Sequence, residues 1–139
     1  MAIPTTNLHG ARIVEQIQRN LIQLQHDMGN NAKTHKAMAQ AQSPDLATLQ
    51  SFVVDCVTQY LRRLQWIIDL RADAAKRATL LTMLSKIGWV ENDIVNIVTA
   101  LRSEAITLQN APQTTYAQII AACDATIAAV NPPDSLWPE

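Results

Sequence analysis

Residues that break helices are confined to the ends of apolar segments with a helical repeat, and this restricts the fold more than any other feature of the sequence. The chain of 139 residues contains only three glycines and six prolines. The glycines are Gly10, Gly29 and Gly88, and the prolines are Pro4, Pro44, Pro112, Pro132, Pro133 and Pro138. Proline interrupts a helix and glycine weakens one, so the segments between them can each form a helix. No segment combines strand-like alternation with hairpin turn residues. The pattern predicts an all-α fold.

The first apolar segment runs from about Asn7 to Met28 and repeats apolar residues every three or four positions. We expect Thr5 or Thr6 to cap it. Gly29-Asn30-Asn31 is expected to interrupt the pattern. The piece that follows, Ala32 to Gln42, lacks a large apolar stripe. It is expected either to prolong the helix or to form a loosely held arm.

The clearest helix start in the sequence is Ser43-Pro44-Asp45. Serine as the N-cap, proline at the first helical position and an acid in the first turn all favour initiation. An apolar repeat then continues for about seven turns, as far as Arg71. Two continuations stay open at this point. The helix either runs on unbroken through Ala72 or bends there, with Asp73 capping a new helix.

Local signals also place the later helix boundaries. Gly88 predicts a helix end, with Trp89 or Val90 folding back over it. Asn92 or Asp93 is expected to open the next helix.

Thr114 or Thr115 is expected to cap the last helix. The chain is thus predicted to be a single helical domain, an antiparallel bundle of four to five helices with a short, proline-bounded C-terminal tail. We expect the bundle core over residues 43–130 and the tail over 131–139. Residues 1–42 are expected to contribute an N-terminal arm or a hairpin.

Charge and hydropathy exclude several kinds of partner. The formal net charge is −1, with 11 basic and 12 acidic residues, so no bulk attraction to nucleic acid or to anionic lipid is expected. The densest basic spots, Lys33-His35-Lys36 and Arg62-Arg63, are expected to be solvated or paired with acids. No run of apolar residues is long enough to cross a membrane, and the first residues do not resemble a signal peptide. We therefore expect a cytoplasmic or virion location.

No residue pattern in the sequence indicates catalysis. The histidines His9, His26 and His35 form no metal-binding motif. Cys56 and Cys123 lie on apolar helical faces, where thiols are expected to be buried, free and inert. Three glycines cannot build the loops that bind nucleotides. The expectation is a protein that is no enzyme and has no cofactor and no metal site.

One large aromatic residue is predicted on the polar side of its helix. At 100° per residue, Trp66 lies about 160° from the apolar line of the helix that begins near Ser43. Phe52 and Leu70 are predicted on the flank between Trp66 and that line, close to Arg62 and Arg63. Aromatic and arginine residues beside apolar neighbours are typical of protein contact sites. The alternative is that another helix of the same chain covers this flank.

The tail carries Leu136 and Trp137 after two prolines, and is expected to dock on its own bundle or, preferably, on a neighbouring molecule. Abundant Gln, Asn and Thr with few charges give the chain a composition similar to that of small helical virion components, such as phage decoration, neck or internal head proteins. We expect a subunit of a larger protein assembly, a homo-oligomer or part of a hetero-complex, that acts through apolar contacts. The alternative is a helical adaptor or chaperone-like module that holds a partner segment in an apolar groove.

Overall fold

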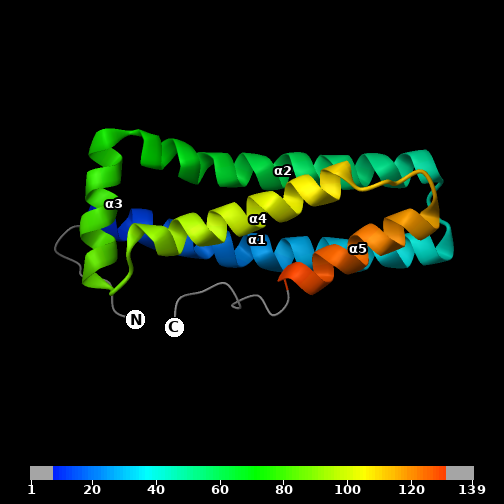
Figure 1. The fold of residues 1–139 in the computed structure, drawn as a ribbon, viewed down its shortest axis with the longest axis horizontal. Helices are drawn as coiled ribbons and strands as arrows, with labels where there is room; N and C mark the ends of the chain where they lie inside the picture. Colours follow the sequence, from blue (N-terminus) through cyan, green and yellow to red (C-terminus); the bar gives the residue numbers. More distant parts are fainter. Residues whose placement is uncertain (1–7, 131–139) are drawn as a thin grey trace.

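The computed structural model describes residues 8–130, with side chains from Ile13 onward, and these residues form five helices (Figure 1). The helices are α1 (Leu8–Ala41), α2 (Leu46–Ala72), α3 (Ala74–Lys86), α4 (Glu91–Asn110) and α5 (Tyr116–Val130). The described residues contain no β-strand. The predicted all-α bundle is confirmed. The expected cap at Thr5 or Thr6 and the tail over 131–139 lie outside the described residues.

The helices form an antiparallel bundle around α1 and α2 (Figure 1). α2 runs back along α1, and α3 then crosses one end of the bundle. α4 returns beside α2, and α5 runs back along the C-terminal half of α1. α1 therefore packs between α2 and α5, while α4 contacts the same two helices from the other side.

α1 continues without a break through Gly29-Asn30-Asn31, so the expected interruption is wrong, and of the two alternatives for the piece that follows the prolonged helix is the one observed. Its 34 residues span about 50 Å. Gly29 lies against α5, where a Cβ atom would stand 3.5 Å from Val130 Cγ2. Ala32 and Ala39 are buried against the same helix, in a small cluster with Leu49, Ile119 and Cys123. Burial of this face outweighs the weak helix propensity of glycine and asparagine. Residues 32–41 prolong the helix and form part of one side of the bundle.

α2 begins two residues later than expected, because Ser43 serves the end of α1. The Ser43 N–H donates to Met38 O at 3.1 Å, and Gln42 takes a left-handed conformation with φ of 54°. This arrangement terminates α1 in a Schellman motif. Asp45 is the N-cap of α2, and its carboxylate accepts hydrogen bonds from Thr48 N at 3.4 Å and Thr48 Oγ1 at 2.7 Å.

The chain bends between α2 and α3 at Asp73, which decides between the two continuations. Asp73 ends α2 and caps α3, where its carboxylate accepts a hydrogen bond from Lys76 N at 3.0 Å. At the other end of α3, Gly88 has φ of 78°, and Trp89 N–H donates to Leu84 O at 3.0 Å. Trp89 is only 6% exposed, so the predicted helix end at Gly88 and the fold-back of Trp89 are confirmed.

The remaining two boundaries lie close to their predicted positions. α4 begins at Glu91, slightly before the expected start, and Asp93 accepts a hydrogen bond from Val90 N at 2.8 Å. α5 begins as predicted, since Thr115 Oγ1 accepts a hydrogen bond from Gln118 N at 3.1 Å.

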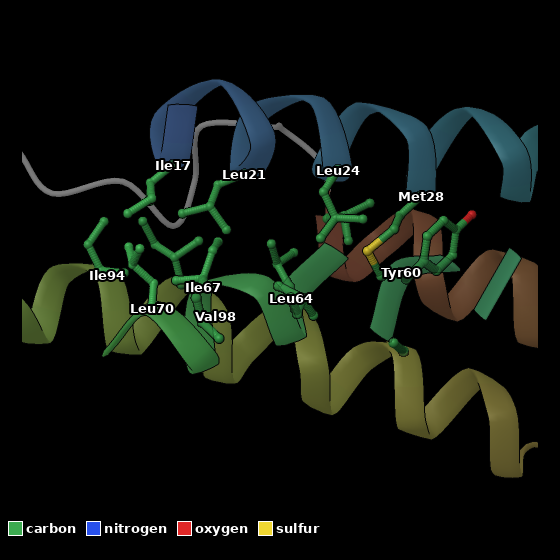
Figure 2. Close-up of a cluster of buried hydrophobic side chains, with 14 of the residues drawn as sticks. Ile17, Leu21, Leu24, Met28, Tyr60, Leu64, Ile67, Leu70, Ile94 and Val98 are labelled. Carbon is green, nitrogen blue, oxygen red and sulfur yellow. The ribbon is translucent and has the colours of Figure 1, made fainter. Parts of the chain in front are cut away.

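The main core lies where α1, α2 and α4 meet (Figure 2). One row of α1 side chains points towards α2 and α4, and the facing residues are fully or nearly buried. The α1 row consists of Ile17, Leu21, Leu24 and Met28, and the facing residues include Leu64, Ile67, Leu70, Ile94 and Val98. The apolar repeats read from the sequence are thus the surfaces that hold the bundle together.

The two glycines at Gly29 and Gly88 are expected to respond oppositely to alanine. Gly29→Ala should raise the free energy of unfolding by about 0.5–1 kcal/mol, because alanine is the better helix former and its Cβ meets Val130 only at an ordinary contact distance. Gly88→Ala should lower it by about 1–2 kcal/mol, because an L-residue is strained at positive φ. Urea denaturation of both variants tests this. A destabilised Gly29→Ala would show that α5 packs too closely to admit the methyl group.

Candidate protein-interaction site

The flank predicted as a contact surface on α2 is partly covered by α1. The Phe52 ring stacks on His35 of α1, with ring centroids 6.4 Å apart and planes inclined by 25°. Arg63 Nη1 donates to Asp27 Oδ2 of α1 at 2.7 Å. Phe52 nevertheless remains 38% exposed and Trp66 37% exposed. A helix of the same chain, α1, therefore covers the part of this flank that faces it, as the alternative prediction had it, and the rest of the flank stays exposed.

Leu70 does not line this exposed flank. It is only 8% exposed and lies in the main core near Ile94 and Val98, as Figure 2 shows. The expectation that it is a surface contact is wrong, because α2 packs against α1, α3 and α4 and buries a wider arc than one stripe. Arg62 is exposed as expected. Leu136 and Trp137, the other predicted contacts, lie outside the described residues.

The basic spot around His35 is divided between surface and interior. Lys33 is exposed, and Lys36 Nζ forms an ion pair with Asp124 of α5 at 2.8 Å. His35 is buried, and burial lowers its pKa because the charged imidazolium loses solvation. The spot therefore joins α1 to α2 and α5 and does not present a row of solvated cations.

Both thiols are free, and their surroundings give them little reactivity. Cys123 is buried, and burial raises its pKa to about 11. Cys56 is half-buried, and burial raises its pKa as well. Thiols held in the neutral form are poor nucleophiles. Within the described side chains, no three His, Cys, Asp or Glu residues gather where they could hold a metal ion. None of the described helices is both long and apolar enough to cross a membrane.

A groove between α2 and α4 is the surface feature that sequence reasoning missed. It encloses about 390 Å³ and is lined by both apolar and polar side chains. The apolar residues are Ile67, Ile68, Val95, Val98 and Ile106; the polar ones are Arg71, Thr99, Arg102, Ser103 and Thr107. One signal for it was present in the sequence. Two adjacent isoleucines stand near the end of α2: Ile67 is buried in the core, and Ile68 is half-buried, packs against the core and also lines the groove.

Two arginines make the groove positive. Arg71 Nε lies 3.4 Å from Glu91 Oε2, but Glu91 also accepts two shorter hydrogen bonds from Arg77, at 2.7 and 2.8 Å. Arg77 and then Arg71 hold the pKa of Glu91 at about 2, so it is ionised at neutral pH. Arg102 forms no ion pair with any carboxylate in the described part of the chain. The groove thus combines an apolar floor with unneutralised positive charge.

Truncation of Leu70 is expected to act through stability. Leu70→Ala should lower the free energy of unfolding by about 2–4 kcal/mol, because it leaves a cavity in the core. The matched control is Val54→Ala on the same helix, where the side chain is exposed and the change should cost about 0.5 kcal/mol or less. Equal losses in the two variants, measured by urea denaturation, would contradict the burial of Leu70.

His35 is expected to make stability depend on pH. Its pKa is lowered from 6.5 in the folded chain, so the unfolded chain binds more protons as the pH falls through this value. Neutral His35 therefore contributes to the stability of the fold above pH 6.5, and this contribution is lost progressively as the medium is acidified. His35→Leu should reduce the fall in the free energy of unfolding between about pH 7 and pH 5. His26→Gln, at an exposed position of the same helix, is the control. If the free energy of unfolding of His35→Leu falls as much with acidification as that of the wild type, buried His35 is not the source of the pH dependence.

Comparison with known proteins identifies neither a family nor a function for this chain. Comparison with protein-family models, with curated proteins and with solved structures finds no match for this chain.

Proposed function

We propose that this chain is a non-enzymatic protein-interaction subunit that takes an apolar segment of another protein molecule into the groove between α2 and α4. The observation that carries this proposal is the pairing of an apolar floor with two arginines at one solvent-open seam of the bundle. The predicted contact flank on α2 offers less, since Leu70 is buried and Arg63 is engaged with Asp27. Trp66 and Arg62 remain exposed there, but they lie outside the groove and are not part of the proposed binding site.

The lining of the groove indicates the chemistry of its partner. A volume of about 390 Å³ is at the small end of the range for ligand sites and suits one or two large side chains. The isoleucine and valine floor favours aliphatic or aromatic anchors. Arg71 and Arg102 favour carboxylates beside those anchors, since complementary charge guides association and fixes register. The partner is thus an acidic segment with apolar anchor residues.

The composition supports a setting for this activity. A surface with few charges and many neutral amides is weakly self-repelling and suits close contact with other subunits. Its similarity in composition to small helical virion components supports a phage particle as that setting. In such an assembly, many equal contacts of modest affinity reinforce one another through effective concentration.

Peptide selection on the full chain tests the proposal. Displayed random peptides should yield sequences that combine apolar anchors with Asp or Glu. Arg102→Glu should weaken the binding of the selected peptides about tenfold, measured by fluorescence anisotropy, because it reverses a charge at the groove. Arg62→Glu makes the same change at an exposed position outside the groove and should leave binding unaltered. Equal effects of the two variants, or selected peptides without acidic residues, would contradict the proposal.

A further inference from the structure

We infer that the segment held in the groove is residues 131–139 of a second copy of this chain, an inference that rests on the proposed function. The segment reads NPPDSLWPE and contains both features that the groove requires. Leu136 and Trp137 supply adjacent apolar anchors. Asp134 lies two residues before them and Glu139 two residues after them.

The charges of segment and groove are complementary. The segment carries two carboxylate side chains and no basic residue. The groove presents Arg102 without an ion-pair partner among the described side chains, and Arg71 shares Glu91 with Arg77. The acid on one side of the anchors can approach Arg71 of α2 and the acid on the other side Arg102 of α4, while the anchors contact Ile68 and Val98. A tryptophan between such contacts has the composition of a binding hot spot.

The position of Val130 favours a second copy over the same molecule. Val130 lies in the seam between α1 and α5, beside Gly29 and near Lys33, whereas the groove lies in the seam between α2 and α4. A path between the two seams crosses α4. Half the circumference of a helix with its side chains is about 16 Å. The six residues from Val130 to Leu136 reach about 22 Å at full extension, which leaves little slack to enter the groove. The segment of a neighbouring copy has no such restriction.

This mode of binding makes each molecule both donor and acceptor. Val130, the residue that precedes the segment, lies at one seam and the groove lies at another, so the contact joins two different surfaces. Such a heterologous contact generates a ring if its rotation closes, and an open chain of subunits if it does not. This mode of binding therefore predicts that the protein self-associates more strongly as its concentration rises.

A labelled peptide of residues 131–139 tests the contact directly. The peptide has an amidated end, so that Asp134 and Glu139 are its only acids. It is titrated into full-length Leu136→Ala/Trp137→Ala protein, whose own anchors are removed, and followed by fluorescence anisotropy. Binding should weaken about thirtyfold for a peptide with Trp137→Ala, the loss typical of a hot-spot tryptophan.

Charge reversal locates the binding site of this peptide. Arg102→Glu should abolish most of the binding, whereas the matched Arg62→Glu should not change it. A peptide with Asp134→Lys and Glu139→Lys should bind the Arg102→Glu protein better than the original peptide does. Failure of this exchange, or equal effects of the two arginine variants, would overturn the assignment to the groove.

Light scattering on the full chain decides between a second copy and the same molecule. The wild type should form oligomers that grow with concentration, and Trp137→Ala or an excess of the peptide should return it to a monomer. A wild type that stays monomeric at all concentrations would overturn the second-copy inference. If selected peptides depend on Arg102 but the 131–139 peptide does not bind, this inference fails while the proposed function stands; if no peptide depends on Arg102, both fail.

Discussion

Burial of the apolar row of α1 is the interaction on which the rest of the bundle depends. Ile17, Leu21, Leu24 and Met28 are almost completely removed from solvent, and they are the residues against which α2 and α4 pack. The same helix then extends to Ala41 and supplies the small residues that let α5 approach. Because α1 contacts each of the other four helices, their positions are linked through one hydrophobic surface.

The features that could be predicted from the sequence are those decided within a few residues. Gly88 and Thr115 occupy helix ends as expected, and Asp73 caps α3 as one of the two open alternatives had it, because capping groups bond to backbone atoms three or four positions away. The interruption at Gly29 was predicted wrongly, since packing against α5 overrides a local weakness. Ser43 was misassigned because two helix ends compete for the same residue.

The candidate site was harder to predict because it depends on the contacts between helices. Leu70 was expected at the surface, and only the joint packing of α1, α3 and α4 around α2 shows why it is buried. The groove requires that side chains from two helices leave space between them, and an apolar repeat in one helix carries no information about its neighbour. Of the predicted contact residues, Phe52, Arg62 and Trp66 keep surface exposure, whereas Arg63 is tied to Asp27.

The two ends of the bundle are unlike each other, and this gives the molecule a direction. α3 lies across one end (Figure 1). At the other end each connection is bonded to a neighbouring helix, since Tyr116 Oη of α5 donates to Pro44 O at 2.9 Å and Gln50 Nε2 of α2 donates to Gln113 O at 2.6 Å. Rods with unlike ends gain a defined polarity when they stack head to tail, whereas head-to-head stacking gives none. A filament built from head-to-tail contacts of this chain would therefore have distinguishable plus and minus ends.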